Sequence, residues 1–275
     1  MHPLIGELGL NTGEPQLLHD RRDTTLFKVG DTALKITQGL MAGREGEILA
    51  LLSANHYLAH GPHGDGTWLT TRWLDGPSLW RALESASRGD DSAATRRIVL
   101  ARAAGAAYAL ARLHAAGWSH GDIQPDHIIF EGQGVQLIDL ACAQGPAPVP
   151  FYVHRGGLSH ITSPEVAAQI IASEEHIVLT READIWALGA SLFWAWTQRT
   201  PTNYRAPEAD LADRLADIAA GRLRTIESSR PWAFPAFEQV LRVCLAEDPR
   251  QRPSAAELAA LLVTASSTFG SSLDH

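Results

Sequence analysis

The sequence predicts an α+β fold with two lobes, a small antiparallel β lobe with one helix followed by a larger, mainly helical lobe. Three observations predict it. Short apolar or β-branched runs separated by turn signals fill the first part of the chain. Most of the remainder has apolar residues at helical spacing, with two short apolar strands between the helices. The length of 275 residues is enough to give both lobes a hydrophobic core.

The composition indicates a globular protein, with 45% hydrophobic and 20% charged residues. The net charge of -8 argues against a nucleic-acid partner. Cys142 and Cys244 offer no zinc-ligand spacing, and no run reaches the roughly 18 apolar residues of a membrane span. The first residues lack the order of a signal peptide. We therefore expect a cytoplasmic protein with no membrane partner, and the many alanines and arginines suggest a bacterial source.

In the first lobe, the runs 16–18, 24–29 and 32–37 predict three strands of an antiparallel meander. HDRRD forms the first turn, and the Gly30-Asp31 pair forms a tight second turn. Residues 39–52 predict a helix, although Gly46 costs about 1 kcal/mol relative to alanine there. A further strand over 67–74 ends at Asp75-Gly76-Pro77, so we place the lobe boundary there and assign residues 1–74 to the first lobe.

The second lobe is expected to cover residues 75–265. Ser78 is a candidate N-cap for a helix over 78–87, and further helices are predicted over 93–116, 184–197, 209–220, 236–246 and 254–265. HIIF and VQLID, at 127–130 and 135–139, predict two short strands. The small, polar residues 266–275 predict a frayed tail.

Two aspartates stand in suggestive places. Asp122 lies in the loop HGDIQPDH before one short strand, and Asp139 follows the other strand, seventeen residues later (139 minus 122). A hydroxyl is a poor nucleophile unless it is aligned and its proton is accepted, and a carboxylate on a rigid loop provides both. Magnesium prefers hard oxygen ligands, which a carboxylate at a strand end supplies. Asp122 and Asp139 are therefore candidates for a base and a metal ligand, roles that depend on the resemblance described next.

These motifs resemble those of protein kinases. HGDIQPDH resembles the catalytic loop, and Asp-Leu-Ala at 139–141 stands where kinases usually carry Asp-Phe-Gly. Ala33-Leu34-Lys35 resembles the Ala-x-Lys of the third kinase strand, and 163–165 resembles Ala-Pro-Glu. Residues 183–189 and DPRQRPSAAEL resemble later family signatures. The chain is similar to bacterial eukaryotic-like Ser/Thr protein kinases from about residue 16 to 262, with aminoglycoside phosphotransferase-like features in Gly121 and the glycine-free loop HDRRDTT.

The resemblance implies ATP as cofactor, with Mg²⁺ or Mn²⁺. It assigns Asp122 as the base, Asp139 as a metal ligand, and Lys35 as the phosphate-binding lysine that Glu45 pairs with and aims. Further candidates for binding the nucleotide are Arg22 or its neighbour Arg21, together with Thr24, Leu26, Ala33, Arg72, Leu74 and Ile129. Residues expected to support the site are His120, Glu165, Asp184 and Arg252, with Glu165 and Arg252 as a buried pair.

The sequence departs from the family pattern at several positions. His127 stands where the family has an asparagine that ligates the second metal, so it either is a soft metal ligand or donates a hydrogen bond to phosphate or to Asp122. Gln124 replaces a lysine, and Asp126 either faces a cationic substrate group or caps the turn. Gly121 replaces the arginine that would receive a phosphorylated activation loop, so switching by loop phosphorylation is not expected.

Three functions remain open at this point. The leading hypothesis is transfer of the ATP γ-phosphoryl to a Ser or Thr hydroxyl of a protein or peptide, with a biosynthetic precursor peptide as one variant. The second is a small-molecule hydroxyl kinase, suggested by Gly121 and the glycine-free loop. The third is a pseudokinase that acts by binding nucleotide or a partner protein, suggested by His127, Gln124 and Ala141. A partner protein would bind at the activation segment or the helical lobe.

Overall fold

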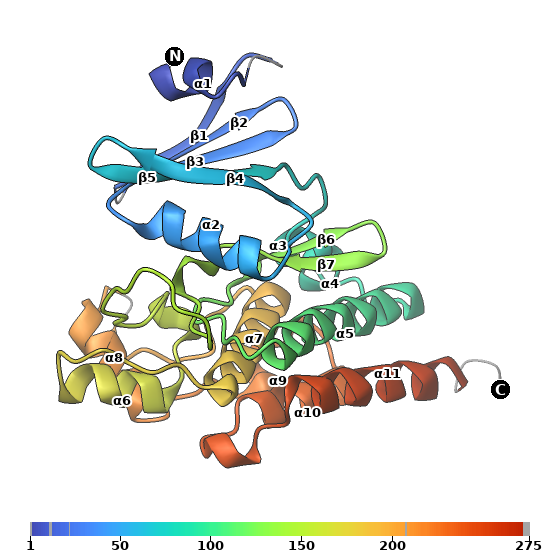
Figure 1. Ribbon diagram of the computed structural model, residues 1–275. Coiled ribbons are helices and arrows are strands. Elements are labelled where there is room, and N and C mark those ends of the chain that lie inside the picture. The colour runs from blue at the N-terminus through green and yellow to red at the C-terminus, as the bar shows by residue number, and fades with distance from the viewer. Residues whose placement is uncertain (1, 11–12, 22, 207, 272–275) are drawn as a thin grey trace. The chain divides into compact units, whose positions relative to one another are not determined.

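The computed structural model describes residues 2–10, 13–21, 23–206 and 208–271, which form two compact units (Figure 1). Unit 1 comprises the described residues up to Asp75, together with Asp139–Ala141 and Ala147–Tyr152. Unit 2 comprises the rest of the described chain, from Gly76 onward. The sequence predicted a single boundary between residues 74 and 75. It did not predict that two later segments belong to unit 1.

Unit 1 contains a five-stranded antiparallel sheet with the strand order β1-β2-β3-β5-β4. The strands are β1 (Gln16–Arg21), β2 (Thr24–Val29), β3 (Thr32–Gln38), β4 (Tyr57–His63) and β5 (Gly66–Arg72). Gly30, at a φ of 56°, forms the predicted tight turn between β2 and β3. The first turn is shorter than predicted, because β1 continues to Arg21, which pairs with Thr24.

The sequence analysis missed β4. Its segment YLAHGPH mixes polar residues with Pro62 and has no clear alternation, so it does not read as a strand. Its position at the edge of the sheet explains why this sequence is tolerated, since Pro62 lacks the N–H that a central strand would need.

The two faces of the sheet in unit 1 have different partners, because alternate residues of a strand point to opposite faces. Leu34 of β3 and Val29 of β2 are buried against Leu4 and Ile5 of α1 (Pro3–Glu7). Lys35 alternates with Leu34 and so faces the side where α2 (Met41–Leu51) lies (Figure 1). The sheet therefore presents Lys35 to α2.

Two glycines allow α2 to approach the sheet closely. A Cβ on Gly46 would lie 2.3 Å from Cγ of His60 in β4, and one on Gly43 would lie 2.9 Å from Cγ2 of Thr67 in β5. The Thr67 hydroxyl also accepts a hydrogen bond from the Gly43 N–H at 2.9 Å. From the sequence alone, Gly46 only lowers the stability of the helix. In the structure, the packing of α2 against His60 of β4 requires a glycine at this position.

Unit 2 is mainly helical, with a two-stranded antiparallel sheet of β6 (Ile128–Glu131) and β7 (Gly134–Leu137). Its helices of eight residues or more are α5 (Ala93–Ala115), α6 (Pro164–Ala172), α7 (Arg181–Thr197), α8 (Leu211–Ala219), α10 (Pro235–Cys244) and α11 (Ala255–Ser271). Helix α7 lies in the core, with most of its residues buried, and α11 packs along α5 (Figure 1). The largest fully buried side chains of unit 2 are Trp186, Phe193, Trp196, Phe234 and Phe237.

Several helices of unit 2 differ from prediction. The helix expected over 78–87 is divided at Leu83 into α3 (Leu79–Ala82) and α4 (Glu84–Ser87). Helix α6 and the short α9 (Ile226–Ser229) were not predicted. Helix α11 continues to Ser271, so residues 266–271 extend that helix where a frayed tail was expected.

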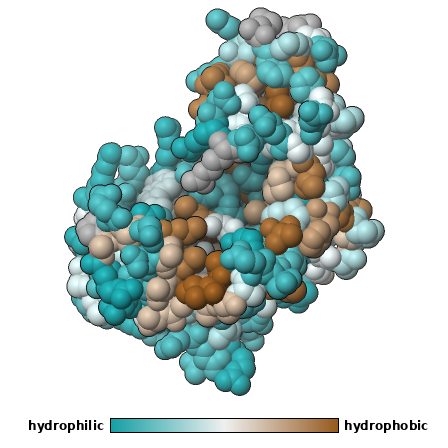
Figure 2. Space-filling view, turned by 90° about the vertical axis from the view of Figure 1, so that its left-hand side faces the viewer, coloured by the Kyte–Doolittle hydropathy of each residue, from teal (hydrophilic) through white to brown (hydrophobic). Residues whose placement is uncertain are grey.

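Part of the surface of unit 2 is apolar. Figure 2 shows hydrophobic side chains gathered on the face where Figure 1 shows α6 and α8, and exposed apolar residues of these helices include Ile171 and Leu211.

Across the residues that the structure describes, no helix combines the length and apolar composition that crossing a bilayer would require.

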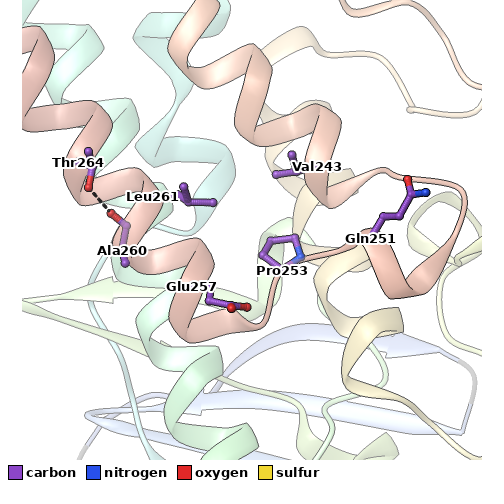
Figure 3. A pocket seen from close by; sticks show the side chains of 7 residues that line it. All are labelled: Val243, Gln251, Pro253, Glu257, Ala260, Leu261 and Thr264. Atoms are coloured by element: carbon purple, nitrogen blue, oxygen red, sulfur yellow. Dashed lines mark hydrogen bonds between the residues drawn. The ribbon is translucent and has the colours of Figure 1, made fainter.

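An open depression of about 520 Å³ lies beside α10 and α11 (Figure 3). Within it, the Thr264 hydroxyl donates to the Ala260 carbonyl at 3.0 Å. Glu257 is its one titratable side chain, and this carboxylate caps α11 by accepting from the Ser254 N–H at 2.8 Å. The lining residues are Val243, Gln251, Pro253, Glu257, Ala260, Leu261 and Thr264. Gln251, Pro253 and Glu257 belong to the motif DPRQRPSAAEL, but no residue assigned to the candidate site lines this depression.

Candidate active site

The first cluster of candidate site residues lies in unit 1, around Lys35. The Lys35 ammonium donates to Glu45 Oε2 of α2 at 2.8 Å and to Asp139 Oδ1 at 2.8 Å. The side chains of Lys35 and Glu45 are 17% and 7% exposed, whereas that of Asp139 is 38% exposed. Lys35 is therefore paired with Glu45, and Asp139 is the carboxylate of this cluster most open to solvent.

The charge on Lys35 is stabilised by these neighbours. Burial opposes the charged form, but the carboxylates of Asp139 and Glu45 raise the pKa of Lys35 well above its usual value. The lysine is therefore a fixed cation, held from two sides, at the place where the sequence predicts a phosphate-binding group.

Asp139 has an unusual backbone. Its φ is 60°, in the left-handed region that few residues other than glycine occupy. The next N–H, that of Leu140, donates to Glu45 Oε1 at 3.3 Å, and residues 140–142 form a short 3₁₀ turn. Strain of this kind persists only where surrounding contacts hold it, which the contacts from Lys35 and Glu45 do here.

The other nucleotide candidates are distributed over both units. Ala33 lies two residues before Lys35 on the same face of β3 and pairs with Thr71 of β5. Arg72 ends β5, Leu74 follows it in unit 1, and Thr24 begins β2. Arg22 lies outside the described residues. Ile129 is buried in β6 of unit 2.

The second cluster lies in unit 2, in the loop between α5 and β6. Both carboxylate oxygens of Asp122 accept hydrogen bonds within the chain. Oδ1 accepts from the Leu158 N–H at 3.2 Å, and Oδ2 accepts from the side-chain amide of Gln124 at 3.0 Å. Gly157 is so near that a Cβ there would lie 2.4 Å from Asp122 Oδ1. Asp122 is thus fixed by its own loop and by the backbone at 157–158.

His127 completes this network. Its Nδ1 lies 2.9 Å from the Asp122 carbonyl oxygen and its Nε2 lies 3.1 Å from Nε2 of Gln124. A carbonyl only accepts and an amide nitrogen only donates, so Nδ1 carries the proton and Nε2 accepts. Both ring nitrogens of His127 therefore serve to hold the loop, which favours the hydrogen-bonding alternative over the soft-ligand alternative.

The loop is also held from below by buried groups. Asp184 of α7, which is 2% exposed, accepts from the backbone N–H groups of His120 and Gly121 at 2.8 and 2.9 Å. It also lies 2.9 Å from Nε2 of His114. His120 is fully buried, its Nδ1 accepts from the Asp122 N–H at 3.3 Å, and its Nε2 lies 3.2 Å from the Ile138 carbonyl. Asp184 and His120 thus fix the backbone around Asp122.

A second support lies between α6 and the turn before α11. The Arg252 guanidinium, with a side chain fully buried, donates to both oxygens of Glu165 at 2.6 and 2.9 Å. Burial opposes the charged form of Glu165, but the bonds from Arg252 hold its pKa below the usual value of 4.5. The bidentate pair ties the start of α6 to the turn before α11.

The structure thus forms two groups from the predicted residues. Lys35, Glu45 and Asp139 meet in unit 1, and Asp122, Gln124 and His127 meet in unit 2. Asp126 is exposed beside the second group. Among the residues that the structure describes, no three or more His, Cys, Asp or Glu side chains are arranged to hold a metal ion. The sequence reasoning did not single out Arg44 or Leu158, and no spacing rule points to them.

Comparisons with known proteins identify the family of this chain. Residues 56–261 match the family model for the protein kinase domain, a span that includes Asp122 and Asp139. The probable serine/threonine-protein kinase PkwA of Thermomonospora curvata is 29% identical over 206 residues, covering 74% of this chain and 25% of that protein. Serine/threonine-protein kinase PAK 4 of Mus musculus is 28% identical over 206 residues, covering 74% of this chain and 31% of that protein.

Serine/threonine-protein kinase 16 of Mus musculus is 26% identical over 194 residues, covering 68% of this chain and 61% of that protein. The chain spans a quarter to a third of the length of PkwA and PAK 4. The similarity therefore concerns a domain of those two kinases. The family match extends over well more than half of the chain, and its two-unit architecture agrees with it, so this chain belongs to the protein kinase family.

Proposed function

We propose that this chain is an ATP-dependent protein kinase that transfers the γ-phosphoryl group to a Ser or Thr hydroxyl of a protein or peptide. The observation that carries the proposal is the pair of fixed clusters, a cationic one around Lys35 and a carboxylate one around Asp122. The kinase family membership and the names of the Ser/Thr kinases it resembles support the same reaction.

The Lys35 cluster fits a nucleotide bound with a divalent cation. Lys35 supplies a permanent charge for phosphate, and the more exposed Asp139 supplies the hard oxygen that Mg²⁺ or Mn²⁺ prefers. A bound cation would neutralise charge on the phosphates and on the transferred group. We assign Asp139 as the ligand of the divalent cation. We assign His127 a different role, which is to hold the loop around Asp122.

Asp122 is the group we assign to the acceptor hydroxyl. Its carboxylate would orient the hydroxyl and take its proton, which requires the hydroxyl to share or replace one of the two hydrogen bonds that Asp122 now accepts. Gln124 would donate to the transferred phosphoryl but brings no charge. Ala33, Leu74 and Ile129 are proposed contacts for adenine, and Asp126 a proposed contact for the acceptor chain.

The test is phosphate transfer from γ-labelled ATP with Mg²⁺ or Mn²⁺, to the protein itself and to Ser- and Thr-containing peptides. The parent protein should transfer label, and Asp122→Asn and Asp139→Asn should lower transfer by at least about 100-fold. Asp91→Asn serves as the control, since the Asp91 side chain is 66% exposed and has no assigned role in the site, and it should retain most of the activity. A parent protein that binds ATP and transfers nothing to any acceptor would refute the proposal.

One observation favours a second candidate, a nucleotide-binding scaffold without transfer. Both oxygens of Asp122 are engaged inside the chain, and Gly157 packs against this carboxylate. If these contacts keep the acceptor hydroxyl away from Asp122, the chain binds ATP but transfers no phosphate. ATP with a divalent cation then raises the melting temperature of the parent and of Asp122→Asn equally, and neither protein transfers label. A melting temperature that ATP raises, together with transfer that only Asp122→Asn loses, would decide for the enzyme.

A further inference from the structure

Arg44 is a buried cation on α2 that the sequence analysis did not single out. The residue is 4% exposed. Its Nε donates to the Ala141 carbonyl at 2.9 Å and its Nη1 donates to the Pro150 carbonyl at 2.6 Å. The guanidinium also lies over the ring of Tyr152, 5.1 Å from the ring centre. All of these partners belong to unit 1.

These contacts join two separate pieces of chain. Asp139–Ala141 and Ala147–Tyr152 are the two later segments that belong to unit 1, while the residues between them belong to unit 2. Arg44 bonds to the last residue of the first segment and to a residue within the second. One side chain of α2 therefore anchors both segments to the same unit.

The first segment is held residue by residue. Lys35 contacts the Asp139 side chain, Glu45 accepts from the Leu140 N–H, and Arg44 donates to the Ala141 carbonyl. Asp139 needs such restraint, since its φ of 60° is unfavourable for a non-glycine residue. Arg44 supplies the contact on the C-terminal side of this strained residue.

We propose that Arg44 is a positioning residue that fixes Asp139 and the segment up to Tyr152 on α2 without any phosphorylated residue. Its link to catalysis rests on the proposed function, in which Asp139 holds the cation, but the anchoring itself does not. The position where a kinase would carry a phosphate-receiving arginine is Gly121, whose φ of 80° disfavours any side chain.

The chemistry of the contact requires arginine. A guanidinium is planar and donates in several fixed directions, so it bridges two carbonyl oxygens while its face lies on an aromatic ring. A lysine ammonium keeps the charge but cannot span both carbonyls and stack on Tyr152. Arg44→Lys therefore separates the bridging geometry from the charge, and Arg44→Met removes both.

The experiment is hydrogen–deuterium exchange of the whole chain, read on peptides that cover residues 139–152. Both Arg44→Lys and Arg44→Met should raise exchange there by about tenfold or more relative to the parent, while peptides of β2 and β3 exchange as before. Arg88→Lys is the control, since Arg88 lies on the surface with its side chain 76% exposed. Phosphatase treatment of the parent should leave its protection of residues 139–152 unchanged.

A second readout concerns the cation. Arg44→Lys should raise the Mn²⁺ concentration needed for half-maximal ATP-dependent thermal stabilisation by at least about threefold, because Asp139 is less well held. If residues 139–152 exchange equally in the parent and in Arg44→Lys, or if phosphatase removes the parent's protection, the proposal is wrong. A chain that transfers no phosphate but shows the expected exchange pattern would refute the proposed function and leave the anchoring intact.

Discussion

The cluster around Lys35 and the cluster around Asp122 are held by different kinds of contact. In unit 1 the candidate functional side chains form ion pairs with one another, because Lys35 lies between the carboxylates of Glu45 and Asp139. In unit 2 the Asp122 carboxylate accepts hydrogen bonds from a backbone N–H and from the Gln124 amide, and Nδ1 of His127 lies 3.6 Å from its Oδ2. Within the part of the chain that the structure describes, no arginine or lysine pairs with Asp122, and the buried guanidinium of Arg252 pairs with Glu165 at a separate support.

This difference follows from what each cluster is proposed to bind. Phosphate groups need a permanent cation, and a buried lysine keeps its charge only beside carboxylates. A base that takes a proton must not be neutralised by a strong ion pair, and neutral donors orient it at a smaller electrostatic cost. The cluster in unit 1 thus places an ion pair where a ligand is proposed to bind, whereas the Arg252–Glu165 pair of unit 2 lies where two elements join.

The largest effect should come from the support in unit 2. Arg252→Met removes a buried guanidinium that donates to Glu165 and to the Ala246 and Glu182 carbonyls, so we expect a loss of about 3–5 kcal/mol in the free energy of unfolding. Urea unfolding followed by tryptophan fluorescence would measure it. A loss below about 1 kcal/mol would mean that this ion pair is not a main support of unit 2.

Removal of the cation in unit 1 should weaken ligand binding. Lys35→Met leaves Glu45 and Asp139 without their shared partner, and we expect ATP affinity to fall by about 10- to 100-fold, the effect of losing charge-assisted hydrogen bonds. Isothermal calorimetry would check it. Lys28→Met is a matched control, since Lys28 is the other lysine of the chain and lies over the Trp73 ring. Equal losses in both variants would contradict a special role for Lys35.

The packing of α2 should also matter to the cluster in unit 1. Gly46→Ala puts a Cβ 2.3 Å from Cγ of His60, a ring that Tyr57 holds through a 2.8 Å hydrogen bond, so the helix must shift. We expect a loss of about 1–3 kcal/mol in the free energy of unfolding, measured by urea, and weaker ATP binding. Gly6→Ala has open space and should change stability by less than about 0.5 kcal/mol. A neutral Gly46→Ala would show that the approach of α2 is adjustable.

Smaller effects are expected from the neutral network of unit 2. His127→Ala removes the donor to the Asp122 carbonyl and the acceptor for Gln124, and should lower kcat by about tenfold. His127→Asn keeps a donor and an acceptor and should lower kcat by less than about threefold. Steady-state kinetics with varied ATP and Mn²⁺ would measure both. A large rise in the Mn²⁺ requirement of His127→Ala alone would indicate metal ligation by His127.

The smallest effect is a pH dependence of the support. Because Arg252 holds the pKa of Glu165 below 4.5 in the folded protein, the pair contributes stability above that pH. This contribution is lost as the pH falls through the folded pKa of Glu165. Glu165→Gln should therefore be less stable than the parent at pH 7, with the difference shrinking below pH 4.5. Melting temperatures measured across this range would test it, and a constant difference would contradict the assignment.

The sequence predicted features that depend on local pattern. The tight turn at Gly30, the strands flanking it and the long helices follow from periodicity and turn chemistry, and the motif residues follow from their resemblance to kinases. Strand β4 escaped because an edge strand tolerates Pro62 and polar residues. The turn at Gly30, its flanking strands and the long helices depend on a few neighbouring residues each. Strand β4 forms because of its position in the sheet, which its own residues do not reveal.

What escaped prediction at the candidate site depends on distant contacts. Arg44 donates to residues 97 and 106 positions later in the chain, which no spacing in the sequence indicates. Gln124 differs from the expected lysine, and only its contacts show that it joins His127 to Asp122. Residue type and motif register therefore suggested the candidates, while the hydrogen bonds that orient them are seen only in the folded structure.

The residue beside Asp122 also limits how this protein can be engineered. Gly121 has a φ of 80°, and a Cβ there would lie 2.3 Å from Cδ1 at the end of the Leu179 side chain. An arginine introduced there to create a phosphorylation-responsive variant would have to adopt a backbone conformation that favours glycine, and the Leu179 side chain would have to move. A single substitution at this position therefore carries a conformational cost, and a design of such a control would also have to relieve the positive φ.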